Sequence, residues 1–174
     1  MSKTDYDLKN LRAVIFDVDG VLSPSTVPMD ENGVPCRMVN IKDGYALQLA
    51  AKTNLKIAII TGANTTSLIK RYGALGIKDV FIGASFKFEV MNKWLADNAI
   101  LPEETAYVGD DIPDYQCMKA VGLAVAPNDA AREIKDIAHY ITVSDGGYGV
   151  ARELLEQVLA TRGEWLNHAD AFGW

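Results

Sequence analysis

Short runs of apolar, mostly β-branched residues recur along the chain, and longer stretches with helical spacing of apolar positions separate them. The apolar runs cover 13–16, 57–60, 80–82 and 106–108, with weaker ones at 123–126 and 140–143. Such uninterrupted runs are typical of strands buried on both faces of a parallel sheet. The helical patterns fall at about 43–53, 64–75, 86–98, 112–121, 129–137 and 149–161. This alternation predicts an α/β fold, a doubly wound parallel sheet with helices on both faces, in a single domain over 1–174.

The stretch 23–41 interrupts this alternation. Its centre, Asp30-Glu31-Asn32-Gly33, suits a turn with positive φ, and extended segments flank it. We therefore predict a β-hairpin flap that projects from the end of the first strand. A two-stranded ribbon cannot bury its own apolar side chains, so we expect another copy of this chain to cover them. These side chains are Val27, Met29, Val34, Met38 and Val39.

The C-terminal tail, about 167–174, has no periodic pattern and ends in Phe172-Gly173-Trp174. Its aromatic end indicates one of two states, a frayed terminus or a strap that docks on another surface.

Charge and composition narrow the function. The chain has 174 residues, 17 basic against 23 acidic, a formal net charge of −6 and 49% hydrophobic residues. A folded core is therefore expected, and an acidic chain is a poor partner for nucleic acid. Cys36 and Cys117 match no metal or redox spacing, which favours a reducing cytoplasm. No apolar run approaches the roughly 18 residues that span a bilayer, so no membrane association is expected.

Polar residues follow four of the predicted strands directly or after a short loop. Because parallel strands end at a common edge of the sheet, these side chains should meet in one crevice. They are Asp17 and Asp19, Thr61 and Gly62, Lys87, and Asp110, Asp111 and Asp114.

Converging carboxylates repel one another unless a cation neutralises them, so this crevice predicts a divalent metal site. Mg²⁺ suits oxygen ligands, and Asp17 and Asp110 with a main-chain oxygen at Asp19 would hold it. The cluster has no histidine, which argues against zinc. Each feature also has a purely structural reading: an Asp-x-Asp-Gly turn, a helix N-cap at Asp110-Asp111, or a surface Lys87. Their coincidence at one edge favours a functional site.

The four segments at this edge are, in chain order, Asp17-Val18-Asp19-Gly20-Val21-Leu22, Thr61-Gly62, Lys87 and Gly109-Asp110-Asp111-Ile112-Pro113-Asp114. They resemble the four motifs of the haloacid dehalogenase superfamily of phosphotransferases. The resemblance extends to its capless branch of 3-deoxy-D-manno-octulosonate 8-phosphate phosphatases and covers nearly the whole chain after residue 10. The supporting segments are Lys42-Asp43-Gly44, Leu75-Gly76-Ile77, 106–111 and 146–153. The resemblance implies a Rossmann-like sheet without a cap domain. The intervals between motifs, 18–60 and 88–109, are also too short to hold a separate cap domain.

The resemblance implies that Asp17 is the nucleophile, that Asp19 is the general acid and base, and that hydrolysis proceeds through an aspartyl-phosphate. Thr61, Gly62 and Lys87 would hold the phosphate. Asp110 would bind Mg²⁺ directly, while Asp111 and Asp114 would orient the metal site and Lys87.

For the sugar acid, the resemblance implies contacts from Arg71, whose guanidinium can hold a carboxylate, and from Lys42 and Asp43. It also implies a cytoplasmic homotetramer in lipopolysaccharide precursor synthesis, with the hairpins packed centrally and each tail covering a neighbouring site. Some relatives carry a charged residue directly after the Thr-Gly pair, whereas this chain has Ala63. A nine-carbon ulosonate 9-phosphate is therefore an alternative substrate.

Two alternatives come from other functional classes: a receiver-like phosphoacceptor domain and an inactive metal-binding scaffold. A receiver would carry its acidic pair early and a lone acceptor aspartate midway, whereas here Asp110-Asp111 comes last. His139, His168 and Cys117 are expected to have structural or solvent-facing roles rather than catalytic ones.

Overall fold

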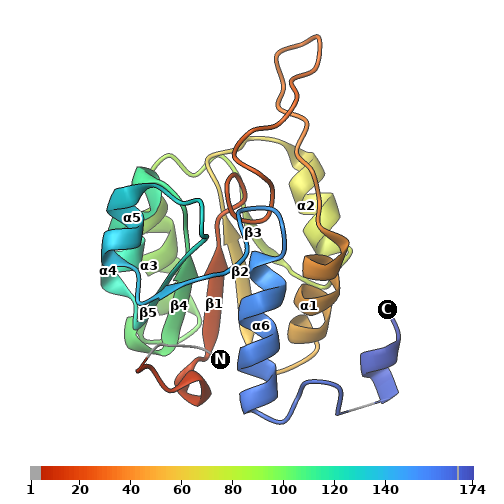
Figure 1. Ribbon diagram of the computed structural model, residues 1–174, viewed down its shortest axis with the longest axis vertical. Helices are drawn as coiled ribbons and strands as arrows, with labels where there is room; N and C mark the ends of the chain where they lie inside the picture. The colour runs from red at the N-terminus through yellow and green to blue at the C-terminus, as the bar shows by residue number, and fades with distance from the viewer. Residues whose placement is uncertain (1–4, 168) are drawn as a thin grey trace.

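The computed structural model describes residues 5–167 and 169–174. Six parallel strands form one sheet in the order β3-β2-β1-β4-β5-β6, with β1 and β4 side by side at its centre (Figure 1). The strands are β1 Ala13–Phe16, β2 Lys56–Ile60, β3 Asp79–Phe81, β4 Thr105–Val108, β5 Leu123–Ala126 and β6 Tyr140–Ile141. The order reverses at β1, so the crevice for a ligand opens at the ends of β1 and its neighbours.

Helices cover both faces of the sheet, as the alternating pattern predicts (Figure 1). They are α1 Ile41–Ala51, α2 Thr66–Gly73, α3 Lys87–Asp97, α4 Tyr115–Ala120, α5 Arg132–Ile137 and α6 Val150–Thr161. Short 3₁₀ turns lie at η1 Leu8–Asn10, η2 Pro102–Glu104, η3 Ile112–Asp114 and η4 Ala169–Phe172. No helix of the described ranges has both the length and the apolar character needed to cross a membrane.

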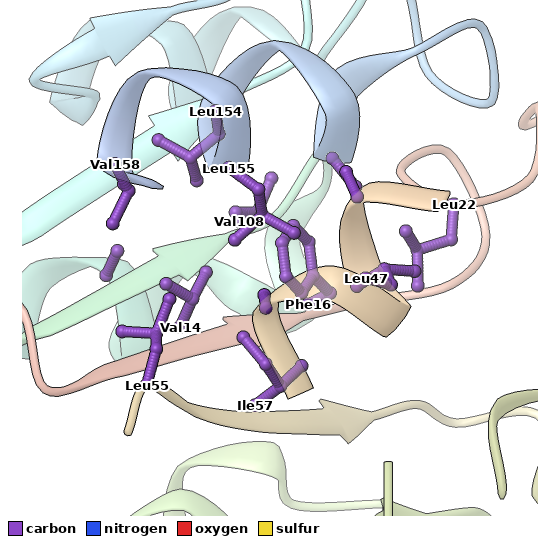
Figure 2. Packing of buried hydrophobic residues seen from close by; sticks show 14 of the residues in the cluster. Val14, Phe16, Leu22, Leu47, Leu55, Ile57, Val108, Leu154, Leu155 and Val158 are labelled. Carbon is purple, nitrogen blue, oxygen red and sulfur yellow. The ribbon is translucent and has the colours of Figure 1, made fainter. Parts of the chain in front are cut away.

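Two hydrophobic cores follow from the alternation of side chains along β1. Val14 and Phe16 face one core with Leu47 of α1 and Leu155 of α6 (Figure 2). Ile15 belongs to the other core, beneath α3, α4 and α5. All residues of β1 are fully buried. The central strand is therefore rigidly held, and its C-terminal end is a fixed platform for the residues that follow it.

The predicted strands and helices are confirmed with shifts at their ends. The strand predicted over 140–143 stops at Ile141, because the carboxylate of Glu153 accepts the N–H groups of Val143 and Ser144. The helix predicted over 112–121 begins as the 3₁₀ turn η3, which contains Pro113, and becomes α-helical only at Tyr115.

Residues 24–40 form the projecting hairpin, which rises beyond the body of the molecule (Figure 1). The N–H of Asp30 donates to Val34 O at 2.9 Å, and Gly33 has the predicted positive φ of 80°. The ribbon is shorter than predicted, with Met29–Pro35 as its antiparallel bridge. Pro28 and Pro35 have no N–H to extend the ladder. Met29 is 70% exposed, so a covering partner remains a prediction.

The C-terminal tail lies against α1 of its own chain. The Tyr45 hydroxyl donates to Ala171 O, and the Trp174 ring meets Tyr45 edge-on at 6.2 Å. Ala171 is buried, whereas Phe172 and Trp174 are exposed. The tail is therefore docked, and a role over a neighbouring site remains a prediction.

Candidate active site

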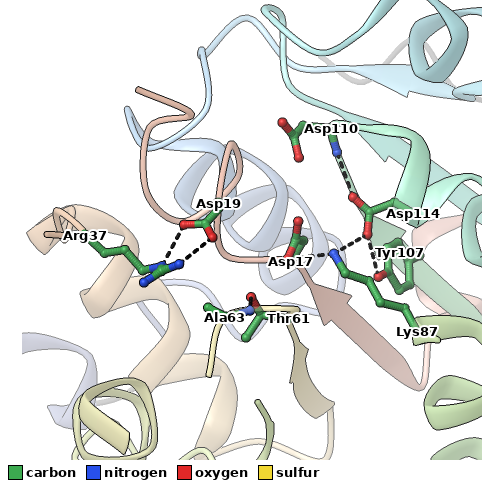
Figure 3. Close-up of polar contacts among 9 residues, drawn as sticks. All are labelled: Asp17, Asp19, Arg37, Thr61, Ala63, Lys87, Tyr107, Asp110 and Asp114. Carbon is green, nitrogen blue, oxygen red and sulfur yellow. Dashed lines mark hydrogen bonds and ion pairs between the residues drawn. The ribbon is translucent and has the colours of Figure 1, made fainter. Parts of the chain in front are cut away.

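The residues that follow β1, β2 and β4, with the start of α3, meet at one edge of the sheet (Figure 3). They surround a cavity of about 440 Å³. The cavity is lined by Asp17, Asp19, Ser25, Thr61, Gly62, Ala63, Ala84, Ser85, Lys87, Asp110, Asp111, Pro113 and Asp114. A larger open groove of about 700 Å³ runs along β6 and α6, but it is remote from these residues. The structure thus brings together the residues of all four sequence motifs.

The amine of Lys87 lies between the carboxylates of Asp17 and Asp114 (Figure 3). Its Nζ lies 2.9 Å from Asp17 Oδ1 and 2.8 Å from Asp114 Oδ1, and its side chain is only 6% exposed. Burial alone would lower the pKa of Lys87, but the charges of Asp114 and Asp17 outweigh it and raise that pKa. Lys87 is therefore a fixed cation at the wall of the cavity.

Three carboxylates offer oxygen atoms within 4.8 Å of one another, those of Asp17, Asp110 and Asp114. Burial, and then the charge of Asp114, raises the pKa of Asp17 to about 7. Burial, and then the charges of Asp17 and Asp114, raises the pKa of Asp110 to about 8. A bound cation would relieve both effects. Because this cluster presents only oxygen donors, it suits Mg²⁺ rather than zinc.

The oxygens of Asp114 are already engaged within the protein. Oδ1 accepts hydrogen bonds from Lys87 Nζ and from the Tyr107 hydroxyl at 2.8 Å, and Oδ2 accepts from the N–H of Asp110 at 3.2 Å. Asp114 thereby orients both Lys87 and the chain at Asp110. Asp17 and Asp110 are left as the carboxylates with room to bind a cation. Asp111 lies exposed at the rim.

Asp110 fits only because residue 20 is glycine. A Cβ atom on Gly20 would lie 1.9 Å from Asp110 Oδ2, and Gly20 has a φ of +81°, which side chains other than glycine's rarely adopt. The last residue of the Asp-x-Asp-Gly motif thus serves a motif some ninety positions later in the chain. The sequence pattern identified this glycine but not the partner that requires it.

Thr61 is buried at the end of β2. Its Oγ1 accepts the N–H of Ala63 at 3.1 Å, which leaves its O–H free to donate into the cavity. Gly62 is exposed beside it, with open space where a side chain would be. This turn therefore offers a small, polar surface to a bound anion.

Asp19 has a partner that sequence reasoning missed. Arg37 donates from Nε to Asp19 Oδ1 at 2.7 Å and from Nη2 to Oδ2 at 2.8 Å (Figure 3). Arg37 comes from the hairpin, in a segment whose pattern indicated an exposed ribbon. Tyr107 was also missed, because its position inside an apolar run marks it only as core.

The predicted sugar contacts lie apart from the acidic cluster. Arg71 lines a second cavity of about 300 Å³, between α2 and residues 34–39. Asp43 is 3% exposed, and its Oδ1 accepts the N–H of Arg152 at 2.7 Å, at the start of α6. Burial raises the pKa of Asp43 to about 6. Asp43 thus ties α1 to α6, and Lys42 beside it is exposed; neither lines the cavity of the acidic cluster.

His139 has the structural role expected of it, since its Nδ1 accepts the N–H of Ala124 at 2.9 Å. Cys117 is buried in the core, and His168 lies outside the described residues.

Comparisons with known proteins agree with this geometry. Residues 84–154 match the family model described as haloacid dehalogenase-like hydrolase. The 3-deoxy-D-manno-octulosonate 8-phosphate phosphatase KdsC of Salmonella typhi is 39% identical over 156 residues, which cover 90% of this chain and 83% of that protein. The corresponding protein of Escherichia coli K12 is 38% identical over the same shares.

Solved structures show the same likeness. The phosphatase of that name from Yersinia pestis superposes with a TM-score of 0.86 at 36% identity, covering 90% of this chain and 85% of that one. The Moraxella catarrhalis enzyme, described in complex with a magnesium ion, a phosphate ion and a KDO molecule, has a TM-score of 0.84 at 27% identity, covering 88% of each chain. The chain therefore belongs to the haloacid dehalogenase-like hydrolases, in the family of the 3-deoxy-D-manno-octulosonate 8-phosphate phosphatases.

Proposed function

We propose that this chain is a Mg²⁺-dependent phosphomonoesterase that hydrolyses 3-deoxy-D-manno-octulosonate 8-phosphate to the free sugar acid and phosphate. The observation that carries the proposal is the buried Asp17, which lies beside the cation Lys87 in a cavity that Asp110 also lines. The relative from Moraxella catarrhalis, whose complex holds magnesium, phosphate and KDO, supports the choice of substrate.

The residues present fit a magnesium ion. Asp17 and Asp110 would hold it with a main-chain oxygen at Asp19. Burial first, and the neighbouring carboxylates second, raise the pKa of both carboxyls, and a bound cation would offset both effects. When bound, Mg²⁺ would offset the charge of the carboxylates and of the incoming phosphate, which would otherwise repel each other. Asp114 would keep the carboxylates in place without binding the ion directly, and Asp111 would support it from the rim.

In the first step, an oxygen of Asp17 attacks phosphorus in line, and the bond between phosphorus and the sugar oxygen breaks. Lys87 and the Thr61 hydroxyl hold the phosphoryl oxygens, with Gly62 leaving space for them. Asp19 donates a proton to the departing sugar oxygen. The products of this step are the free sugar acid and an acyl phosphate on Asp17, the aspartyl-phosphate.

In the second step, water attacks the phosphorus of this aspartyl-phosphate while Asp19 takes its proton. The bond between phosphorus and the Asp17 oxygen breaks, which restores the carboxylate and releases phosphate. Asp19 regains the proton that it gave in the first step, so the site returns to its initial state.

For the sugar acid, Arg71 is the contact that we propose, because its guanidinium reaches a cavity next to that of Asp17. Lys42 and Asp43 would act only indirectly, since neither lines either of these two cavities. The exposed apolar side chains of the hairpin support a homotetramer with the hairpins at its centre. The two unpaired cysteines support a reducing cytoplasm as the location.

A nine-carbon ulosonate 9-phosphate is the alternative substrate. The reason is Ala63, which lines the cavity after the Thr-Gly turn and offers no charge to a substrate. Phosphate release by the purified protein with Mg²⁺ should be measured for the eight-carbon and the nine-carbon ester, together with simple sugar phosphates. We expect the highest kcat/KM for the eight-carbon ester. A preference for the nine-carbon ester would reassign the substrate, and no turnover of any phosphate ester would favour an inactive metal-binding scaffold. The receiver alternative has no support from the family or from the motif order.

A further inference from the structure

Arg37 is the charged residue of the hairpin that turns toward the body of the protein. Between residues 25 and 39, every residue is exposed except Val27 and Arg37. The side chain of Arg37 is only 13% exposed, although the adjacent residues Cys36 and Met38 are exposed. A long cationic side chain folded inward from an exposed ribbon indicates that its partner at the site holds it there.

That partner is Asp19, which Arg37 holds by both carboxylate oxygens. Such a bidentate pair is the strongest geometry that a guanidinium and a carboxylate can form. A carboxylate in this arrangement faces the guanidinium, so it cannot at the same time approach the leaving oxygen of a substrate. Asp19 is therefore held toward the hairpin, on the side of the cavity that Arg37 lines.

The pair stands where two cavities meet. Asp19 lines the cavity of Asp17, whereas Arg37 lines the second cavity, together with Arg71, Thr65 and Ser67. Besides its apolar residues, the second cavity is thus lined by two arginines and by three hydroxyl-bearing residues, Thr65, Ser67 and Tyr72, a set of donors that suits a carboxylate with neighbouring hydroxyls. A phosphorylated sugar acid carries its phosphate and its carboxylate at opposite ends, which matches the two cavities.

We propose that Arg37 exchanges carboxylates during turnover: the carboxylate of the substrate replaces Asp19 on the guanidinium, and Asp19 is released toward the leaving oxygen. This inference rests on the proposed function. The exchange replaces one bidentate ion pair with another, so it requires little net free energy. A phosphate ester without a carboxylate must break the pair with nothing to replace it. Arg37 is then a positioning residue that makes turnover depend on the carboxylate of the substrate.

The test compares two substrates whose leaving groups are both sugar alkoxides, 3-deoxy-D-manno-octulosonate 8-phosphate and D-ribose 5-phosphate, which has no carboxylate. In Arg37→Met, we expect kcat/KM for the carboxylated ester to fall roughly tenfold to a hundredfold, the range for a lost hydrogen bond to a charged group. For ribose 5-phosphate, kcat should rise, because the wild type must break the pair of Arg37 and Asp19 with nothing to replace it, whereas the variant has no such pair to break. Arg37→Lys should restore part of the loss, since an ammonium attracts a carboxylate but cannot bind it bidentately.

Arg12→Met serves as the matched control and should leave kcat/KM unchanged for both substrates, because Arg12 pairs with Glu104 at the end of β1 opposite to Asp17. An equal loss for both substrates in Arg37→Met would overturn the exchange, because Arg37 would then only orient Asp19. An unchanged kcat/KM for both substrates in Arg37→Met would overturn the exchange as well. A wild-type protein that hydrolyses ribose 5-phosphate but not the sugar acid ester would overturn the proposed function together with this inference. Turnover of ribose 5-phosphate also shows that the variant is folded.

Discussion

Replacing Asp17 with asparagine should remove activity and yet stabilise the metal-free protein. The pKa of Asp17 rises from 3.8 to about 7 in the fold, chiefly because the carboxyl is buried. One pKa unit corresponds to about 1.36 kcal/mol, so the ionised carboxylate lowers the free energy of unfolding by up to roughly 4 kcal/mol above pH 7. An amide carries no charge and avoids this penalty, but it cannot attack phosphorus as an anion.

The sign of this effect can be followed with pH. Below pH 3.8, Asp17 is protonated in both the folded and the unfolded chain and imposes no penalty. Between pH 3.8 and about 7, the unfolded chain ionises first, so the free energy of unfolding falls as the pH rises. Above about pH 7, Asp17 is ionised in both states, and the reduction in the free energy of unfolding stays constant. The advantage of Asp17→Asn should therefore be largest at pH 8 and should shrink as the pH is lowered toward 4.

Urea unfolding at pH 8, in EDTA and in MgCl₂, measures this effect, and phosphate release measures activity. In EDTA, Asp17→Asn should unfold at a higher urea concentration than the wild type. In MgCl₂, the wild type should gain more stability than the variant, because only the wild type keeps both carboxylate ligands. Asp97→Asn, which changes an exposed carboxylate paired with Lys93, should change none of these quantities. A variant that is no more stable in EDTA would refute the burial argument, and near-normal turnover would refute Asp17 as the nucleophile.

Three further experiments test the site. Gly20→Ala should weaken Mg²⁺ activation more than tenfold, because the added Cβ displaces Asp110. Gly33→Ala is the control, since Gly33 has a similar positive φ but open space around it, and it should leave Mg²⁺ activation unchanged. The same Mg²⁺ dependence in both variants would contradict the steric argument. EDTA should abolish phosphate release and added Mg²⁺ should restore it, whereas full activity in EDTA would exclude a required metal. Removing residues 167–174 should slow hydrolysis of the eight-carbon ester more than that of p-nitrophenyl phosphate, and equal slowing of both would reject the tail as a lid.

The hydrophobic pattern predicted the sheet, its helices and the edge that carries the site, because uninterrupted apolar runs leave few alternatives to buried parallel strands. The residues that follow those strands converge for the same reason: parallel strands end at one edge. Asp17 and Asp110 could therefore be placed in one site although they lie far apart in the chain. The strand order, with β1 beside β4, could not be read from the pattern, since every apolar run resembles the others.

The contacts of charged side chains required the folded structure. Asp43 was expected to contact sugar, but the packing of α1 on α6 buries it at the start of α6. The sequence pattern did not indicate that Arg37 belongs to the site, because its pairing with Asp19 depends on the path of the hairpin over the end of β1. Hydrophobic periodicity reports which face of an element is buried. Which carboxylate meets which guanidinium depends instead on distances between elements that are remote in sequence, and these are defined only when the layers pack.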